Sequence, residues 1–361
     1  MAETIHHGEK FRTKLAKYLA QGSVTDHAFN HDIDAEFTGT DTVHIYEIAT
    51  TPINNYDKTV DPSKGSRFGP VTDVGDYQYT FKMTQDVSLD RVVDKSNNNM
   101  QFLIKTAAKV MKAYTDKEIR PTKDKYRLKK WAEEAGIHVA LAAEPTKETI
   151  LESIIDLHSE MIDAGAPEEG GTLFIPRKYV KAIKLAPEWT GLDSLGGKTL
   201  PKGALKGTYD GLVVQPIPNR YAPKDFYFSI YMKESIISPE KINTFRTITD
   251  SENFDGDRMQ FHSKYDAFVM PSQAAGAAVA CAKDSVCATP TVKIGSGTAT
   301  VTDTSGGTVY YTLDGSDPRY ASADAKVYSA AVTVKKGDIF RCCAKKDGKY
   351  FSAATYDYIA E

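Results

Sequence analysis

The largest group of potential metal ligands lies near the N-terminus and consists of Asp26, His27, His31, Asp32 and Asp34. Two histidines four positions apart could share one helix face and bind a divalent cation. The surrounding residues are typical of a loop, however, and no glutamate lies between the histidines to act as a base. A solvated polar segment is the favoured interpretation, so the sequence predicts no metal-binding residue.

Patterns that would indicate an enzyme are incomplete. The run Gly196–Thr199 lacks the upstream glycine and the four-residue spacer of a phosphate-binding loop. Ser194 is not flanked by glycines in the way that a nucleophile elbow requires. His158 lies beside the apolar stripe of an expected helix and is interpreted as a boundary residue. We therefore predict that the chain is not an enzyme and that it has no catalytic residue and no cofactor.

Cysteine occurs only in the last quarter of the chain, as Cys281, Cys287, Cys342 and Cys343. This distribution is not a disulfide framework for the whole chain, and the spacing fits a zinc site poorly. We expect free, reduced thiols. Because Cys342 and Cys343 are neighbours in an expected strand, one sulfur should face a core and the other should face solvent.

Length and charge limit the classes of protein that remain. The 361 residues suggest about two domains. With 45 basic and 48 acidic side chains the net charge is -3, which argues against a dedicated nucleic-acid binder. No stretch reaches the roughly 18 apolar residues of a membrane span, and the N-terminus lacks a signal-peptide pattern. We expect a soluble protein made in the cytoplasm.

The composition changes near residue 270, after which short β-rich runs alternate with turn residues. A small-residue stretch, Gln273–Ala280, ends the first part of the chain or links it to the second. Short strands at this spacing predict a small antiparallel sandwich. The expected strands are Thr291–Ile294, Thr298–Thr302, Thr308–Leu313, Ala331–Val334, Asp338–Ala344 and Lys349–Ile359.

Upstream, Thr42–Ile48 and Tyr77–Met83 alternate polar and apolar residues and predict the two strands of a hairpin. The connection between them is too long for an ordinary hairpin loop. It is therefore functional, or else a mobile surface loop.

Helical and extended patterns follow the hairpin without a regular βαβ rhythm, which favours an α+β fold. Apolar residues at three- and four-residue steps from Met100 to Tyr114 predict a helix that Pro121 interrupts. The helix resumes at Tyr126 and stops before Gly136. The other expected elements are helices at Thr149–Ile162 and after Pro176, and strands at Thr172–Ile175, Gly211–Ile217, Asp225–Met232 and Phe261–Val269.

Four short runs occur in the first 280 residues in an order that is informative. They are Thr84-Gln85-Asp86, Glu118–Tyr126, Glu168–Pro176, and the series Ser238–Ile242, Phe254–Gly256 and Tyr265–Val269. In this order they resemble the major capsid proteins of tailed bacteriophages, whose fold is shared with herpesvirus capsids. The resemblance implies a capsid domain over residues 1–282, with an N-arm (1–40), an extended loop (42–93), a spine helical region (97–135), and peripheral and axial domains in the remainder.

The run Val309–Tyr320 resembles the signature of immunoglobulin-like modules at the C-termini of chitobiase-type glycosidases. Physically, Tyr311 and Leu313 alternate on a strand that Asp314-Gly315 breaks, and Asp317-Pro318 begins the next turn. The resemblance implies an immunoglobulin-like domain over residues 283–361, outside the shell, which could contact glycans weakly and carries no catalytic residue.

The resemblance implies a major capsid protein that self-assembles into the icosahedral head around a phage genome. Its partners would be copies of itself in hexamers and pentamers, a separate scaffolding protein, a portal and non-specifically packaged double-stranded DNA. No membrane partner is expected, and the location would be the virion, after assembly in the host cytoplasm. The alternatives are another virion protein, such as a tail-tube subunit, and a carbohydrate-binding protein.

Charged residues in the long hairpin loop are the candidate contacts between subunits, through charge complementarity. Some family members cross-link this loop through a lysine, but no residue of this chain identifies a partner, so no catalytic role is assigned. The candidate contacts are Lys58, Lys64, Arg67, Asp57, Asp61 and Asp73.

Overall fold

The computed structural model describes residues 22–31, 36–38, 42–48, 55–60, 65–69, 73–100, 106–186, 208–249, 255–295, 297–303, 305–320, 325–355 and 358–359. Two units emerge from the contacts within the chain. The smaller, the hairpin unit, is Ile33–Met83, and the larger combines Met1–Asp32 with Thr84–Glu361. Within the larger unit we distinguish an α+β domain, up to residue 282, from a C-terminal module, residues 283–361.

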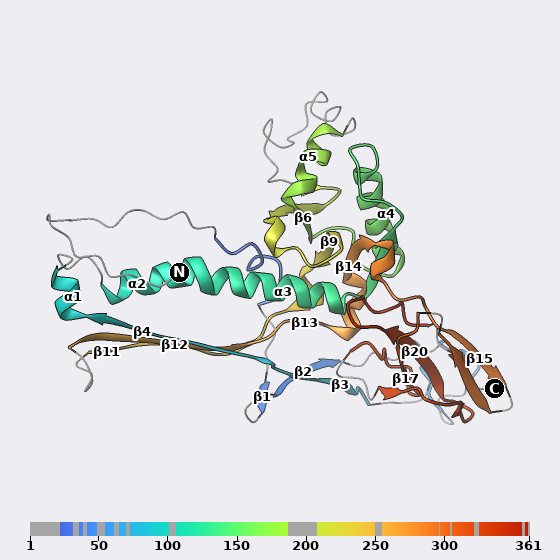
Figure 1. Cartoon of the computed structure of the whole chain (residues 1–361). Coiled ribbons are helices and arrows are strands. Elements are labelled where there is room, and N and C mark those ends of the chain that lie inside the picture. The colour runs from blue at the N-terminus through green and yellow to red at the C-terminus, as the bar shows by residue number, and fades with distance from the viewer. Residues whose placement is uncertain are drawn as a thin grey trace. The chain divides into compact units, whose positions relative to one another are not determined.

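A six-stranded mixed sheet forms the centre of the α+β domain (Figure 1). Its strands, in spatial order, are β5 (Ile137–Leu141), β14 (Ala277–Ala282), β9 (Phe226–Met232), β6 (Gly171–Pro176), β8 (Leu212–Ile217) and β7 (Thr208–Tyr209). Strand β6 has the apolar run Leu173–Pro176 and is buried at every position, as expected for a strand covered on both faces.

Helices cover both faces of this sheet. On one face, α4 (Ile150–Asp163) and α5 (Arg177–Leu185) share an apolar cluster with Leu173 and Ile175 of β6. On the other face, Phe174 belongs to a cluster with Trp131 of α3 (Arg120–Glu134). The helices expected at Thr149–Ile162 and after Pro176 are confirmed, because their apolar stripes have the period of a helix.

One correction concerns the long helical region, which consists of α1 (Lys95–Met100), α2 (Ala107–Tyr114), a π-helical turn (Thr115–Ile119) and α3. The predicted interruption at Pro121 is wrong, since α2 continues through the π-turn into α3. Pro121 lies in the first turn of α3, where its fixed φ suits the helix. The π-turn widens the backbone just before it, so its missing N–H breaks no regular helix interior. Gly136 follows the end of α3, as predicted.

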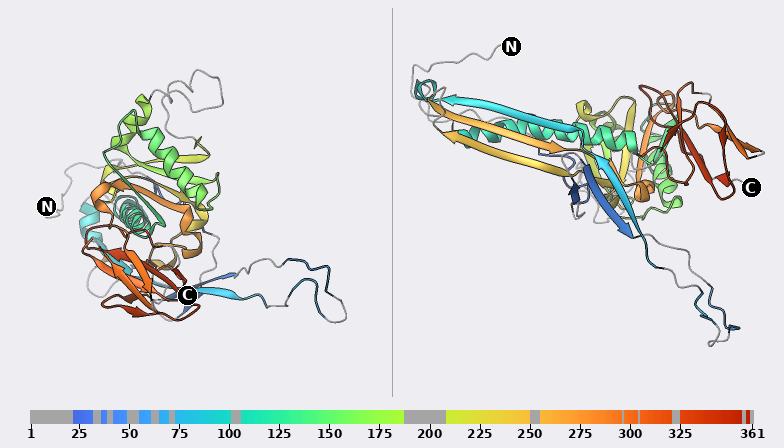
Figure 2. Two further views of the ribbon diagram at one scale, coloured as in Figure 1. Left: turned by 90° about the vertical axis from the view of Figure 1, so that its right-hand side faces the viewer. Right: turned by 90° about the horizontal axis from the view of Figure 1, so that it is seen from below.

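Three long strands run beside this helical region as an antiparallel sheet in the order β11 (Glu240–Thr249), β12 (Gly256–Tyr265) and β4 (Gln85–Asp94) (Figure 2). On β12, buried Met259 and Phe261 alternate with the more accessible Arg258 and Gln260. Sequence analysis identified only the last half of β12 and missed β11 and β4. Most positions of β11 are exposed or half-buried, so its apolar alternation is weak.

Shorter elements complete the domain. The two-stranded pair β10 (Ile236–Ile237) and β13 (Phe268–Val269) joins the long sheet to the central one, and Asn30 bridges to Ile237. The 3-10 turns are Asn219–Tyr221, Lys233–Ser235, Pro271–Gly276 and, in the module, Lys283–Ser285. No helix in the described part of the chain is both long and apolar enough to span a membrane.

The C-terminal module is a sandwich of two antiparallel sheets, as predicted. One sheet contains β15 (Thr291–Gly295), β16 (Thr298–Thr302) and β19 (Val332–Thr333). The other contains β18 (Lys326–Val327), β17 (Thr308–Thr312), β20 (Ile339–Lys345) and β21 (Tyr358–Ile359). The expected strand over Lys349–Ile359 is wrong in its first part. There, Ser352 and Thr355 bond back to β20 from a coil segment.

The prediction that one vicinal cysteine faces solvent is also wrong, because Cys342 and Cys343 are both fully buried. Cys342 belongs to the core between the two sheets. Burial also raises the pKa of Cys343, to about 12, and that of Cys281 to about 11. All four cysteines are free, as expected.

The hairpin unit contains β1 (Glu36–Thr38), β2 (Thr42–Ile48) and β3 (Asp76–Lys82). The two predicted strands are confirmed as an antiparallel pair, with Thr42 opposite Lys82 and Ile48 opposite Asp76. Val43, Ile45 and Phe81 are buried.

Trp131 offers a test of the core. Its side chain is fully buried, and its indole N–H donates to the Ile237 carbonyl oxygen at 3.2 Å. We expect Trp131→Ala to lower the free energy of unfolding by about 3–5 kcal/mol, since it leaves a cavity and an unpaired carbonyl. Ile155→Ala, on the exposed side of α4, should cost much less. Chemical denaturation of both variants measures the difference, and equal losses would contradict the packing described.

Candidate functional site: the roots of the N-terminal segment and the hairpin

Asp124 of α3 holds the N-terminal segment, which is residues 22–31. Its side chain is 2% exposed. It accepts hydrogen bonds from Ser23 Oγ at 2.7 Å, Thr25 Oγ1 at 2.6 Å and the Val24 backbone N–H at 3.0 Å. A buried carboxylate is costly unless its oxygens are bonded, and these three donors satisfy it. The segment therefore supplies groups that the helix cannot supply itself.

Arg127 lies one turn further along α3 and extends the contact. Its guanidinium donates to Thr25 Oγ1 at 3.1 Å, Asp26 Oδ1 at 2.6 Å and Ser238 Oγ at 2.9 Å. The same group lies over the ring of Phe29, 4.7 Å from its centroid. One cation thus joins the N-terminal segment to the connection between β10 and β11 in the α+β domain.

A second buried carboxylate, Asp266, holds the point where the chain leaves the hairpin unit. Thr84, the first residue of the larger unit after the hairpin, donates to Asp266 Oδ2 from its N–H at 2.7 Å and its hydroxyl at 2.9 Å. Tyr126 OH donates to Oδ1 at 2.6 Å. Burial and this bond to a carboxylate raise the pKa of Tyr126, so the phenol remains protonated.

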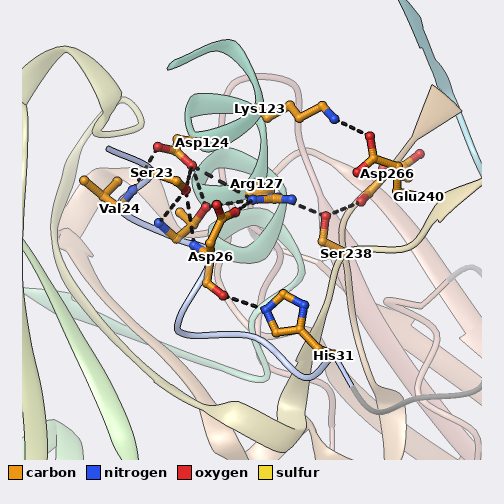
Figure 3. A network of polar contacts seen from close by, with 11 residues as sticks. Ser23, Val24, Asp26, His31, Lys123, Asp124, Arg127, Ser238, Glu240 and Asp266 are labelled. Carbon is orange, nitrogen blue, oxygen red and sulfur yellow. Dashed lines mark hydrogen bonds and ion pairs between the residues drawn. The ribbon is translucent and has the colours of Figure 1, made fainter. Parts of the chain in front are cut away.

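Ser238 connects the two carboxylates into one network, drawn in Figure 3. Its hydroxyl accepts from Arg127 Nε and donates to the Asp266 carbonyl oxygen at 2.9 Å. Alongside, Lys123 pairs with Glu240. The polar network therefore runs without a break from the root of the N-terminal segment, across α3, to the root of the hairpin.

Three of the four short runs quoted from the sequence contribute residues to this network. Thr84 comes from the first run, Asp124 and Tyr126 from the second, and Ser238 and Asp266 from the last series. Sequence reasoning used their order but not their chemistry. A signal was present, because Asp266 is an isolated charge within the otherwise apolar run Tyr265–Val269, where an unpaired carboxylate would be unfavourable.

A cavity of about 420 Å³ adjoins the network between the helical region and the long sheet. Its cations are paired, since Arg120 bonds to Asp116 and Lys123 to Glu240. The other lining residues are Ser23, Asp26, Met111, Thr115, Ile119, Asp124, Arg127, Asn243, Phe245 and Phe261. The mixed lining with matched charges is typical of a structural junction.

The residues first considered for metal binding have other partners. Asp26 pairs with Arg127, and its backbone carbonyl oxygen lies 2.6 Å from His31 Nε2. His27 lies beside the ring of Phe174. Asp32 and Asp34 fall outside the described residues, among which no group of three or more potential ligands is placed to hold a metal ion.

His158, interpreted from the sequence as a boundary residue, is in fact buried. Its Nδ1 lies 2.7 Å from Asp210 Oδ2. The turn before β8 carries Asp210 over this face of α4, which the helical pattern alone does not reveal.

Of the predicted contact residues in the hairpin loop, Arg67 is half-buried and Asp57, Lys58 and Asp73 are exposed, whereas Asp61 and Lys64 are outside the described residues. The Asp57 backbone N–H donates to the Arg67 carbonyl oxygen at 3.0 Å. Hydrogen bonds from Thr59 lower the pKa of Asp57. Lys58 and Asp73 are exposed. Nothing in the single chain tests their role between subunits, which stays a prediction.

Sequence analysis considered only the charges of this loop and missed an aromatic pair. The rings of Tyr56 and Phe68 meet edge to face with centroids 5.0 Å apart. Both are exposed, Phe68 by 78%. An apolar surface of this kind at the tip is unusual for a loop in contact only with water.

Comparisons with solved structures identify the fold. A chain in the capsid structure of cyanophage P-SCSP1u matches with a TM-score of 0.55 at 9% identity, over 76% of this chain and 92% of that one. A chain from Mycobacterium phage Che8 matches at 0.54 and 16% identity, over 74% and 93%. A chain of the mature capsid of bacteriophage PhiM1 matches at 0.53 and 12% identity, over 77% and 92%.

The predicted α+β fold of phage capsid proteins is thereby confirmed. A family model described as Fn3 associated matches residues 299–356, which fits the predicted immunoglobulin-like module. A search of curated proteins finds no match.

Asp124→Asn tests the root of the N-terminal segment. An amide has one accepting oxygen, so at least one of the three donors would face an N–H₂ group. We expect a loss of about 1–3 kcal/mol in the free energy of unfolding, and faster hydrogen exchange at residues 23–31. Glu133→Gln, an equal change of charge at an exposed pair on the same helix, is the control. Unchanged exchange in Asp124→Asn would show that the carboxylate does not hold the segment.

Proposed function

We propose that this chain is the major capsid protein of a tailed phage and assembles with copies of itself into an icosahedral shell around the genome. The observation that carries the proposal is the match in fold to phage capsid chains over about three quarters of its length, with more than nine-tenths of each of those chains covered. In this proposal the C-terminal module is an additional domain on that fold.

The way the extended segments are held supports a role in assembly. Asp124 and Asp266 fix the roots of the N-terminal segment and the hairpin through buried hydrogen bonds. The hairpin unit itself exposes large apolar side chains, namely Tyr46, Ile48, Tyr56, Phe68, Val74 and Tyr77. Segments with firm roots and exposed apolar ends suit a protein whose surface is completed by neighbouring copies.

In this proposal the hairpin tip packs over an adjacent subunit. Its cations are Lys58, Lys64 and Arg67, and its carboxylates are Asp57, Asp61 and Asp73. Both signs of charge are present, so the tip can complement an equally mixed surface of a neighbour. Tyr56 and Phe68 would add apolar area to the same contact.

The other proposed partners follow from what the assembly of a shell requires, and not from the geometry of this chain. Besides copies of itself, the proposed partners are a separate scaffolding protein, a portal and the double-stranded DNA that the closed head encloses. The protein would be structural rather than catalytic and would be located in the virion, after assembly in the host cytoplasm. A glycan contact by the C-terminal module and a tail-tube function are the alternatives, and the capsid fold favours neither.

Deletion of the tip, residues 53–73, with a short Gly-Ser connection between β2 and β3, tests the proposal. We expect soluble subunits that keep their fold but form no shells, because the contact between neighbours is lost while the strand pairing remains. Electron microscopy and sedimentation of the wild-type and deleted proteins distinguish shells from free subunits.

Charge reversal refines this experiment. Lys58→Glu together with Arg67→Glu should reduce shell yield at low salt, whereas Lys293→Glu with Lys346→Glu, in the C-terminal module, is the matched control and should assemble normally. Tubes in place of shells in the wild-type sample would support the tail-tube alternative. Normal shells from the deleted protein would refute the role given to the tip.

A further inference from the structure

The turn that carries the module's sequence signature, Asp317–Tyr320, lies against the α+β domain. The side chain of Arg319 is only 8% exposed. Its Nη1 donates to the Gly136 carbonyl oxygen at 2.7 Å, directly beyond the end of α3. Its Nε and Nη2 bond to the carboxylate of Asp317 at 3.0 and 2.6 Å. Asp317 of the same turn is therefore the counterion of Arg319. The guanidinium uses a further N–H to bind the neighbouring domain.

Aromatic side chains of the module take part in the core of the α+β domain. Tyr320 and Tyr350 belong to the same apolar cluster as Trp131 and Phe174. The Tyr350 ring stacks on His138 of β5, with centroids 5.1 Å apart. Its hydroxyl donates to the Lys224 carbonyl oxygen at 3.2 Å. The boundary between the module and the domain is thus a continuous apolar core with polar contacts beside it.

The titratable groups at the boundary between the module and the domain are largely shielded from solvent. His138 is half-buried near Arg319 and Lys345, and its pKa falls to about 4 because of desolvation and these two cations. The ring is therefore neutral at pH 7. Cys343 lies near Asp317 and Arg319, on the opposite side of β20 from the module core. This explains why both vicinal cysteines are buried, since the second face of the sheet packs on the α+β domain.

The carbonyl group that Arg319 binds belongs to a glycine whose position is fixed within the α+β domain. A Cβ at this position would lie 2.1 Å from the Ala274 carbonyl oxygen, a distance that no side chain tolerates. The Gly136 backbone is therefore packed against the Pro271–Gly276 turn of the same domain at a point where only glycine fits, and its carbonyl is the one that Arg319 binds.

We propose that the Asp317–Tyr320 turn is the docking element that fixes the module to the α+β domain as one cooperative unit, with Arg319 as the positioning residue. The inference does not depend on the proposed function. It means that this signature turn is used inside the chain and is not available to bind a glycan or another external ligand. Any such contact would have to use another surface of the module.

Arg319→Met tests the proposal, with calorimetry and limited trypsin digestion of the full chain. The wild-type protein should unfold in one transition, in which module and domain melt together. The variant keeps the apolar stem but loses the contact to Gly136, so we expect two transitions. Cleavage at the exposed Lys283, between the two parts, should be at least tenfold faster.

Two controls define the result. Tyr320→Phe removes a hydroxyl without a hydrogen-bond partner and should keep a single transition. Lys346→Met removes an equal charge from within the module, where its ammonium bonds to the Ser305 carbonyl oxygen, and should also keep one. A single transition with unchanged cleavage in Arg319→Met would overturn the proposal, as would two separate transitions in the wild-type protein.

Hydrogen exchange of the wild-type chain keeps the test valid if Arg319→Met fails to fold. Backbone amides of β5 (Ile137–Leu141) and β20 (Ile339–Lys345) should exchange through a common opening with the same free energy. Independent openings of the two strands would overturn the proposal.

Discussion

The removal of two carboxylates from water is the constraint on which the rest of the structure depends. Asp124 and Asp266 are both buried, and each has its donors supplied largely by a segment that comes from elsewhere in the chain. Leaving either unpaired would cost more than a typical hydrogen bond contributes. The core around α3 is therefore complete only when the N-terminal segment and Thr84 are in place.

In this arrangement the network fixes some segments of the chain, and other segments remain exposed to solvent. Ser23–Asp26 and Thr84 are bound within the network, whereas Phe68 and Val74 of the hairpin unit are largely exposed to solvent. Two observations concern the same question, namely what covers this surface. The fold is shared with phage capsid chains, and the hairpin has an apolar tip. Both support our proposal that this surface is completed by other copies of the chain.

The C-terminal module follows the same physical rule at a second boundary. Arg319 enters the interior with its own carboxylate, Asp317, and the pair is stabilised by the Gly136 carbonyl oxygen. A buried cation without both partners would be unfavourable. The turn whose sequence indicates a separate module is thus the part that joins this module to the rest of the chain.

Local periodicity in the sequence determined the elements whose burial is one-sided or complete. Strands β2 and β3, helix α4 and the module sandwich could all be predicted, because each repeats its apolar residues with the period of its own geometry. Strand β11 escaped prediction, because it is mostly exposed and its pattern is weak. Only the tertiary structure determined which residues form the candidate site and that Cys343 is buried. Asp124 lies 101 positions from Ser23, Asp266 lies 182 from Thr84, and Arg319 lies 183 from Gly136. No local pattern encodes a partner at such separations, since packing alone brings these groups together.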